Sequence, residues 1–518
     1  MARLSGRSRG CRRCRERRIK CDEKTPECSQ CVRVGKKCPG AVTGLIVFEA
    51  TPVNPKKFQL LIENKPKSSQ APAAAVSPGT DIVLGSGALD PFSSMAVPFD
   101  PATDVYFQHF VLHTARCCLP YSPAILGVWS WQEAMTQPAI HFGVLSMAAS
   151  HRFHLLHEES GTKTTVQEIR RSLEYRHEIL RITQESLAEV APSPSKVTSI
   201  VVMVAYLLCI EGANSNFEAI DAHISGLNDF LRSIGGIDVL DLPTIAFLMG
   251  VDILCAITRG TPPGLPVSQK WAAVAMEHPA IRVSFSPTDD PESDSIPRGI
   301  FKLLGTRFSN AAWSSLLDRP LRNTIQNACR LIIHYETDEL RAENEKIVNY
   351  GDNDPWMMAQ RYLLSLSYDH LGPVDIREPL RRSILVLTMT RYCKFGVFPC
   401  MDTIAKDLKS SLVTRLNVFR TVAPDLFFWI LYTGALAARA RKTSQIYRWY
   451  CESLVEASAA VRLNNWIETE SLLEQFLYVS RASDRVAEEV WHDVISLRNR
   501  SHRDALQTTV DVERSTDV

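Results

Sequence analysis

Residues Cys11–Cys38 read CRRCRERRIKCDEKTPECSQCVRVGKKC, and they hold six of the 14 cysteines of this 518-residue chain. The six follow the spacing C-x2-C-x6-C-x6-C-x2-C-x6-C, which is two copies of C-x2-C-x6-C. A C-x2-C pair lets two thiolates bind one metal ion from a tight turn, and here the pair occurs twice. Two tetrahedral zinc ions need eight ligand positions, so six sulfurs suffice only if two of them bridge both metals. The pseudo-symmetry of the copies favours Cys11 and Cys28, the first cysteine of each, as the bridges.

Other uses of clustered cysteines fit this stretch less well. A disulfide framework suits a secreted protein, and no apolar signal segment follows the basic, polar first ten residues. A thioredoxin-like redox pair needs a surrounding βαβ pattern, which this sequence lacks. A single four-cysteine zinc site would leave two thiols without a role. We therefore expect two zinc ions held by Cys11, Cys14, Cys21, Cys28, Cys31 and Cys38.

Positive charge is concentrated around these cysteines. The whole chain has a formal net charge of +1, yet residues 1–40 hold 13 Lys or Arg against 4 Asp or Glu, whereas the remainder holds 45 against 53. Two Zn²⁺ ions and six thiolates sum to a charge of about −2, so the metal-loaded segment stays strongly cationic. This asymmetry indicates a basic head that binds a polyanion and a body that does not.

The cations of the head point to DNA. From Cys14 to Cys21 the chain advances two helical turns, which places Arg15 and Arg18 on one face. A short arginine-rich helix held by metal fits the major groove, where arginine donates two hydrogen bonds to guanine O6 and N7. A solvated cationic surface or a bare nuclear-import signal is the alternative, but neither explains why the cations lie inside the metal loop. The predicted DNA-binding residues are Arg12, Arg13, Arg15, Arg17, Arg18 and Lys20.

The same stretch resembles the fungal binuclear zinc-cluster transcription factors. The resemblance rests on all six cysteines, on the run C-R-x-R-basic-x-K-C-D that ends at Asp22, and on Pro26 before the fourth cysteine. It implies two zinc ions with Cys11 and Cys28 bridging. It also implies a nuclear protein that regulates genes transcribed by RNA polymerase II, with a pathway-specific role such as the control of a metabolic gene cluster.

The resemblance further assigns roles to single cations. Arg17 and Arg18 would approach a CGG-type triplet, while Arg15 and Lys20 would position the module on phosphates. Arg18 stands where the family usually has lysine, and arginine is not equivalent to lysine at a base contact. The resemblance therefore implies DNA binding more directly than it implies the preferred triplet.

Composition divides the chain into four segments. We expect a zinc-cluster domain over 1–40, a flexible linker rich in Pro, Ser, Ala and Gly over 41–100, an all-α domain over 101–502 and a polar tail over 503–518. Apolar residues after the head make at most one helical turn before Pro66, so no coiled coil is expected and the oligomeric state stays open.

Helical periodicity dominates the body. The segment 219–231 places four apolar residues on one stripe, and Gly235–Gly236 follows as a stop signal. Segments 384–395, 426–439 and 471–477 are also expected to be packed helices, whereas 261–298, with seven prolines, is expected to be a loop. The longest uncharged apolar runs, 197–210 and 426–438, are shorter than a membrane span and are interpreted as buried helices. The stripe consists of Ile220, Ile224, Leu227 and Leu231.

The body is similar to the helical regulatory domain that accompanies this zinc cluster in fungi. The similarity rests on A-H-I-S-G-L at 222–227, which leads to the double glycine, and on P-D-L-F-F-W at 424–429 with Gly434 and Ala435. Such domains modulate activity, and some sense metabolites. The expected partners are thus double-stranded DNA, the transcription machinery and a small-molecule effector, without a membrane.

The sequence contains no P-loop, G-x-S-x-G elbow, H-E-x-x-H motif or complete dinucleotide fingerprint, so no enzymatic activity is expected. His151, His154 and His157 lie at i, i+3 and i+6 and face different ways on one helix, which argues against a shared metal. The eight cysteines of the body lack ligand spacing and are expected to be small buried hydrophobes. The alternative function is a helical metabolite-binding protein or enzyme whose zinc module only tethers it to nucleic acid.

Overall fold

The computed structural model divides the chain into two units, residues 1–74 and 75–518. Within them the structure describes residues 14, 19, 22, 28–34, 38, 97, 101–115, 130, 132–159, 163–188, 193–277, 302–340, 353–391, 395–478 and 485–500. Apart from Val97, the predicted linker 41–100 lies outside these residues, and so do the predicted tail 503–518 and the apolar residues tested for a coiled coil.

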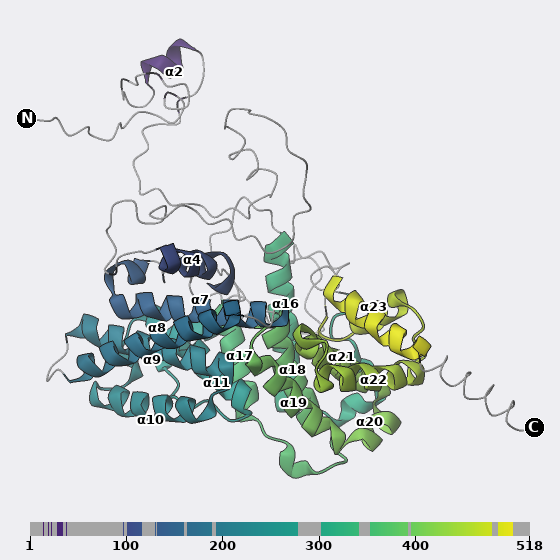
Figure 1. The fold of residues 1–518 in the computed structure, drawn as a ribbon. Coiled ribbons are helices and arrows are strands. Elements are labelled where there is room, and N and C mark those ends of the chain that lie inside the picture. Colours follow the sequence, from purple (N-terminus) through teal and green to yellow (C-terminus); the bar gives the residue numbers. More distant parts are fainter. Residues whose placement is uncertain are drawn as a thin grey trace, which may run out of the picture. The chain divides into compact units, whose positions relative to one another are not determined.

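The described residues of the second unit are mostly helical and contain no strand. The prediction of an all-α body is confirmed (Figure 1). A further helical stretch covers residues 485–500. The elements are α4 (Pro101–His109), the π-helical turn η1 (Phe110–Thr114), α7 (Pro138–Glu159), α8 (Lys163–Leu187), α9 (Pro194–Asn214), α10 (Phe217–Ser233), η2 (Ile237–Val239), α11 (Leu242–Arg259), α12 (Gln269–Met276), α15 (Arg307–Asn310), η3 (Ala312–Leu316), α16 (Arg319–Leu340), α17 (Asp354–Ser365), η5 (Asp369–Leu371), α18 (Arg377–Arg391), α19 (Pro399–Val413), α20 (Leu416–Val422), α21 (Pro424–Ala438), η6 (Arg439–Arg441), α22 (Gln445–Ala460) and α23 (Trp466–Leu473).

Helix α9 is the centre of the first half of the body. It packs against α7, α8, α10 and α11, and its residues from Ile200 to Ala213 are buried on nearly all sides (Figure 1). The Ser193 side chain accepts a hydrogen bond from the Lys196 N–H at its start, and Ser215 ends it in the left-handed conformation. A helix that is apolar all round is stable only inside a core. The apolar run 197–210 is therefore a buried helix, as predicted.

Helix α10 shows how directly the apolar stripe sets the packing. Its buried residues are the four of the predicted stripe. The chain then stops at Gly235 and Gly236, whose φ angles are +96° and +102°. The Gly236 N–H donates to the Leu231 carbonyl at 2.8 Å, which closes the helix end. Only glycine adopts such angles without strain, so the double glycine is a genuine stop signal.

Helix α21 has the corresponding role in the second half. It packs against α18, α19, α20 and α22, and twelve of its fifteen residues are buried. Trp429 stacks on Phe476, with ring centroids 5.4 Å apart, and Phe308 meets both rings edge-on. Helix α11 joins the halves, since it contacts α9 as well as α17 and α19.

Two predictions about the body are wrong in part. The predicted loop 261–298 contains α12. At the start of this helix the Ser268 hydroxyl accepts a hydrogen bond from the backbone N–H of Trp271, and the indole of Trp271 is buried. The predicted helix 471–477 instead ends at Leu473, because the chain turns there to bury Phe476, whose carbonyl accepts from the Gly305 N–H. The predicted helix 384–395 is confirmed over 384–391, which belong to α18.

Within the part of the chain that the structure describes, two helices are long and apolar enough to cross a membrane, α9 and α11. Their most apolar windows are 72% and 67% buried within the body, however. Core helices pass the same length and composition test, so this is weak support for a membrane span.

Candidate metal centre and nucleic-acid interface

Four of the six predicted metal ligands belong to the described residues, and all four are buried. They are Cys14, Cys28, Cys31 and Cys38, with exposed fractions of 8% or less. Together they form a separate small core, against which only Ile19 packs among the described apolar residues of this unit. Cys11 and Cys21 lie outside the described residues. As far as the described residues of this unit extend, the sulfur core has a single aliphatic neighbour and buries little apolar surface.

The sulfur positions fit a zinc site. The Sγ atoms of Cys14 and Cys28 are 3.7 Å apart. Two thiolates that bind one Zn²⁺ at about 2.3 Å with tetrahedral angles lie about 3.8 Å apart. The sulfurs of Cys14, Cys28 and Cys31 all lie within 4.8 Å of one another. Cys28 is therefore close to a ligand from the first copy of the repeat and to one from its own copy.

The backbone around Cys28 explains why two of these sulfurs converge. Helix α2 (Ser29–Arg33) begins directly after Cys28, which is its N-cap residue. The N–H groups of Cys31 and Val32 donate to the Cys28 carbonyl at 3.0 and 3.1 Å. This tight turn brings the two ends of the second C-x2-C pair to the same side, as a shared metal ion requires.

Asp22 is a residue of this site that sequence reasoning did not assign. Its carboxylate accepts from the Ser29 N–H at the start of α2, seven residues further along the chain. Aspartate is among the best acceptors for the first N–H groups of a helix, and Asp22 directly follows Cys21. The sequence signal was thus an aspartate beside a predicted metal ligand. Its hydrogen-bond partner could not be predicted, because that depends on how the loop between the two copies folds.

The six predicted DNA contacts all lie outside the described residues. Their assignment to DNA stays a prediction. The described part of the head has one basic residue, Arg33, which is exposed in the last turn of α2 and donates to Gln30 at 3.3 Å. It belongs to the second copy of the repeat, away in sequence from the arginine-rich first copy. The undescribed six are Arg12, Arg13, Arg15, Arg17, Arg18 and Lys20.

Some histidines of the body, among them His151 and His154, are buried in the core. His151 Nδ1 lies 3.0 Å from His109 Nε2 and 3.2 Å from the Thr114 hydroxyl, and His154 Nε2 lies 2.8 Å from Asn214 Oδ1. Burial lowers the pKa of His109 to about 2 and that of His151 to about 4, so both imidazoles are neutral at physiological pH. His151 and His154 thus use their ring nitrogens on different neighbours.

The described cysteines of the body are buried, as predicted. Burial raises the pKa of Cys329 to about 12 and that of Cys451 to about 11, and it also raises the pKa of Cys255 and Cys400. A thiol that does not ionise is neither a nucleophile nor a metal ligand. These cysteines act as small core residues. The five are Cys209, Cys255, Cys329, Cys400 and Cys451.

Comparison with known proteins agrees with the geometry of the head. Residues 9–41 match the family described as the fungal Zn(2)-Cys(6) binuclear cluster domain. The aspercryptin biosynthesis cluster-specific transcription regulator atnN of Emericella nidulans is 25% identical over 232 residues, which are 43% of this chain and 35% of that protein. The chain thus spans about a third of the length of this curated relative. No solved structure matches the chain significantly.

These findings identify the head. Residues 9–41 are a fungal Zn(2)-Cys(6) binuclear cluster domain, and its cofactors are two zinc ions. The chain therefore carries a zinc-cluster domain in its head, followed by an α-helical body.

Proposed function

We propose that the protein is a nuclear, sequence-specific DNA-binding regulator of transcription by RNA polymerase II in a fungus, and not an enzyme. The observation that carries the proposal is the convergence of the Cys14, Cys28 and Cys31 sulfurs within 4.8 Å, inside the most basic segment of the chain. The name of the similar regulator from Emericella nidulans supports a pathway-specific role, such as the control of a biosynthetic gene cluster.

In this proposal the six cysteines of the head divide between two metals. Cys11 and Cys28 bridge both ions, Cys14 and Cys21 complete the first, and Cys31 and Cys38 complete the second. The 3.7 Å separation of the Cys14 and Cys28 sulfurs and the proximity of Cys31 support the double role of Cys28. Such a small module has almost no apolar core, so metal binding supplies most of its folding free energy.

The first copy of the repeat reads DNA. Arg17 and Arg18 approach the base edges of a CGG-type triplet in the major groove, where a guanidinium binds guanine O6 and N7 together. Arg15 and Lys20 contact phosphates, which supplies affinity without sequence information. Arg12 and Arg13 add to the positive field that attracts the duplex.

The salt dependence of DNA binding tests this proposal. The full-length protein is titrated with a CGG-containing duplex and a scrambled duplex at several salt concentrations. Affinity for both should fall steeply as salt rises, while a gap between the two duplexes persists. Equal affinities at every salt concentration would favour the alternative, in which the zinc module merely tethers a helical metabolite-binding protein or enzyme.

Substitution of single arginines distinguishes contacts to bases from contacts to phosphates. Arg18→Ala should cost about 1–3 kcal/mol on the CGG duplex and narrow the gap to the scrambled one, whereas Arg15→Ala should weaken both alike. Arg33→Ala is the matched control, because Arg33 is an exposed arginine of the second copy. It should leave the gap unchanged. An equal loss on both duplexes for Arg18→Ala would show that Arg18 does not read a base.

Zinc content tests the bridging scheme. Native mass spectrometry of the Cys28→Ala protein should show a greater loss of zinc than that of the Cys14→Ala protein, because a bridging sulfur serves both metals. Cys451→Ala, which alters a buried cysteine of the body, is the control and should keep two zinc ions. Retention of two ions by Cys28→Ala would rule out bridging by Cys28.

A further inference from the structure

Helix α8 has an inner face that packs in the body and an outer face that is also apolar. On the inner face, Tyr175, Ile179 and Thr183 are buried where α8 packs against α7 and α9 (Figure 1). A helix at the surface of a globular body needs only one apolar stripe. The outer face nevertheless exposes large aliphatic side chains. They are Val166, Ile169, Leu173 and Leu187, with exposed fractions of 68%, 42%, 55% and 50%.

The outer face repeats with the seven-residue period of a coiled-coil seam. On a straight helix such a row drifts by about 20° per heptad, so over three heptads it stays on one side. Here the row extends along about 32 Å of the helix axis. This pattern is typical of a helix that pairs lengthwise with another helix. The row consists of Val166, Leu173, Leu180 and Leu187, of which Leu180 is partly buried.

Charged side chains flank this row on one side. Arg170 pairs with Glu174 at 2.8 Å. Arg181 pairs with Glu185 at 2.7 Å. In both pairs the arginine comes four residues before the glutamate, which stabilises a helix less than the reverse order does. The four charges cancel, so the flank lacks the excess of Lys and Arg that is typical of helices on membrane surfaces.

The aliphatic row is complementary to a second copy of itself when two α8 helices lie antiparallel. The register that sets Leu173 opposite Leu180 of the second copy also sets Val166 opposite Leu187. The whole row is then covered by the same row of the other helix. A two-fold axis relates the two copies, so every contact between them occurs twice.

The charged flank supports the same orientation. In an antiparallel pair about a two-fold axis, the same flank of each helix faces that of the other. The register that aligns the leucines also brings Arg170 within two residues of the level of Glu185 of the second copy. It brings Glu174 equally close to the level of Arg181. A parallel, in-register pair would instead set each charge at the level of its own copy, where like charges repel.

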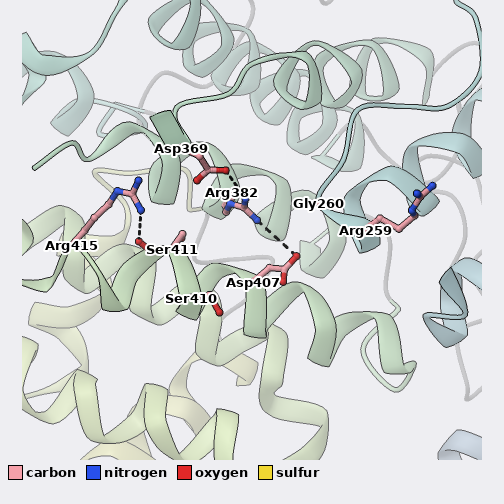
Figure 2. A pocket seen from close by; sticks show the side chains of 8 residues that line it. All are labelled: Arg259, Gly260, Asp369, Arg382, Asp407, Ser410, Ser411 and Arg415. Carbon is pink, nitrogen blue, oxygen red and sulfur yellow. Dashed lines mark hydrogen bonds and ion pairs between the residues drawn. The ribbon is translucent and has the colours of Figure 1, made fainter. Parts of the chain in front are cut away.

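The polar pocket between α18 and α19 differs from this face, because its charged side chains have partners within the body (Figure 2). Arg382 lies 3.3 Å from the carboxylate of Asp369 and 3.8 Å from that of Asp407. The buried Arg415 donates from Nη1 to the Ser411 carbonyl at 3.0 Å. Packing within the body thus accounts for the pocket, whereas it does not account for the aliphatic row on α8.

We propose that the outer face of α8 is a homodimer interface, in which two copies of this chain pair their α8 helices antiparallel. The proposal goes beyond DNA recognition by the head and does not depend on it.

Sedimentation equilibrium of the full-length protein without DNA, over a range of concentrations, tests the proposal. The wild type should form a dimer that dissociates on dilution. Leu173→Lys should raise the dissociation constant at least about hundredfold, because a two-fold interface loses the burial of this leucine twice. Val166→Lys, at the end of the row, should act in the same direction. Both side chains are more than half exposed, so the helix content measured by circular dichroism should be unchanged.

Ile467→Lys is the matched control, because Ile467 is a 77% exposed aliphatic residue on α23, outside the row. It should leave the dissociation constant unchanged. A wild type that is monomeric at every concentration would overturn the proposal. So would equal dissociation constants for Leu173→Lys and Ile467→Lys.

A charge exchange tests the antiparallel register. Arg170→Glu and Glu185→Arg should each weaken the dimer several-fold at low salt, because each sets like charges against each other across the interface. The double variant should recover the affinity of the wild type. Neither pair within the helix is restored in it, so the recovery reports contacts between the copies. A double variant no tighter than the single ones would overturn this register.

Discussion

The carboxylate of Asp22 accepts hydrogen bonds from the backbone N–H of Ser29, with Oδ1 at 3.0 Å and Oδ2 at 3.3 Å. Asp22 directly follows the last cysteine of the first C-x2-C-x6-C copy, and Ser29 directly follows the first cysteine of the second. The bond therefore ties the two copies together without sulfur or metal. It also fixes the start of α2 where Cys28 presents its Sγ to that of Cys14.

Asp22→Ala should make the head release zinc more readily. Loss of an acceptor for a helix N-terminal N–H costs about 1 kcal/mol, which corresponds to about a fivefold change in an equilibrium constant. Competition with a zinc chelator should show this change as a shift of the release midpoint. Asp22→Asn keeps one acceptor oxygen and should lie between the wild type and Asp22→Ala. Gln30→Ala, on the same helix, is the control. An unchanged midpoint for Asp22→Ala would mean that the bond does not stabilise the cluster.

Two helical glycines should respond in opposite ways to alanine. A Cβ at Gly434 in α21 would overlap the ring of Tyr450, a fully buried residue whose hydroxyl donates to the Ala405 carbonyl at 2.8 Å. Gly434→Ala should therefore lower the free energy of unfolding of the body by about 1–3 kcal/mol or more. Denaturant unfolding followed by circular dichroism measures this change.

Gly226→Ala is the counterpart on α10, where a Cβ would meet no atom within 4 Å. Alanine there should raise the free energy of unfolding by about 0.5–1 kcal/mol, because glycine costs more backbone entropy in a helix. Equal destabilisation of both variants would contradict the predicted contrast and the steric role of Tyr450.

The buried histidine pair makes the stability of the body depend on pH. Burial lowers the pKa of His109 to about 2 and of His151 to about 4, and electrostatic interactions with His113, His154 and Arg152 contribute to the lowering. An unfolded histidine binds a proton below about pH 6.5. The folded pair stays neutral there, so its contribution to the stability of the body is fully present above about pH 6.5 and is lost as the pH falls below that value. Each such histidine contributes a slope of up to about 1.4 kcal/mol per pH unit.

His109→Gln should flatten this dependence. The variant is compared with the wild type by denaturant unfolding between about pH 7 and pH 5, where the slope should decrease by roughly the contribution of one histidine. His492→Gln replaces an exposed histidine and should leave the slope as it is. If the wild type and His109→Gln had parallel pH profiles, the pair would not be the source of acid sensitivity.

The sequence allowed prediction wherever one local pattern dominates. The cysteine spacing predicted the sulfur cluster, and the stripe from Ile220 to Leu231 predicted the buried face of α10 together with its glycine stop. It did not predict α12, because the surrounding prolines obscured the cap at Ser268. Nor did it predict Asp22 or Arg415, because a partner seven residues away and the burial of a charge both arise only in the folded chain.

The last prediction concerns the buried ion pair of Arg361 and Asp252, whose side chains are 11% and 0% exposed and 2.9 Å apart. Asp252 also accepts from the N–H groups of Gly264 and Leu265 at 2.8 and 3.1 Å, so it holds the turn before α12. Burial raises the pKa of Asp252, which Arg361 opposes. Arg361→Met should thus lower the free energy of unfolding by about 3–5 kcal/mol, because it leaves the carboxylate of Asp252 without its cation. Arg181→Met, which removes exposed ion pairs on α8, should lower the unfolding free energy far less. Similar losses for the two variants in denaturant unfolding would show that the buried pair contributes no more than a surface pair.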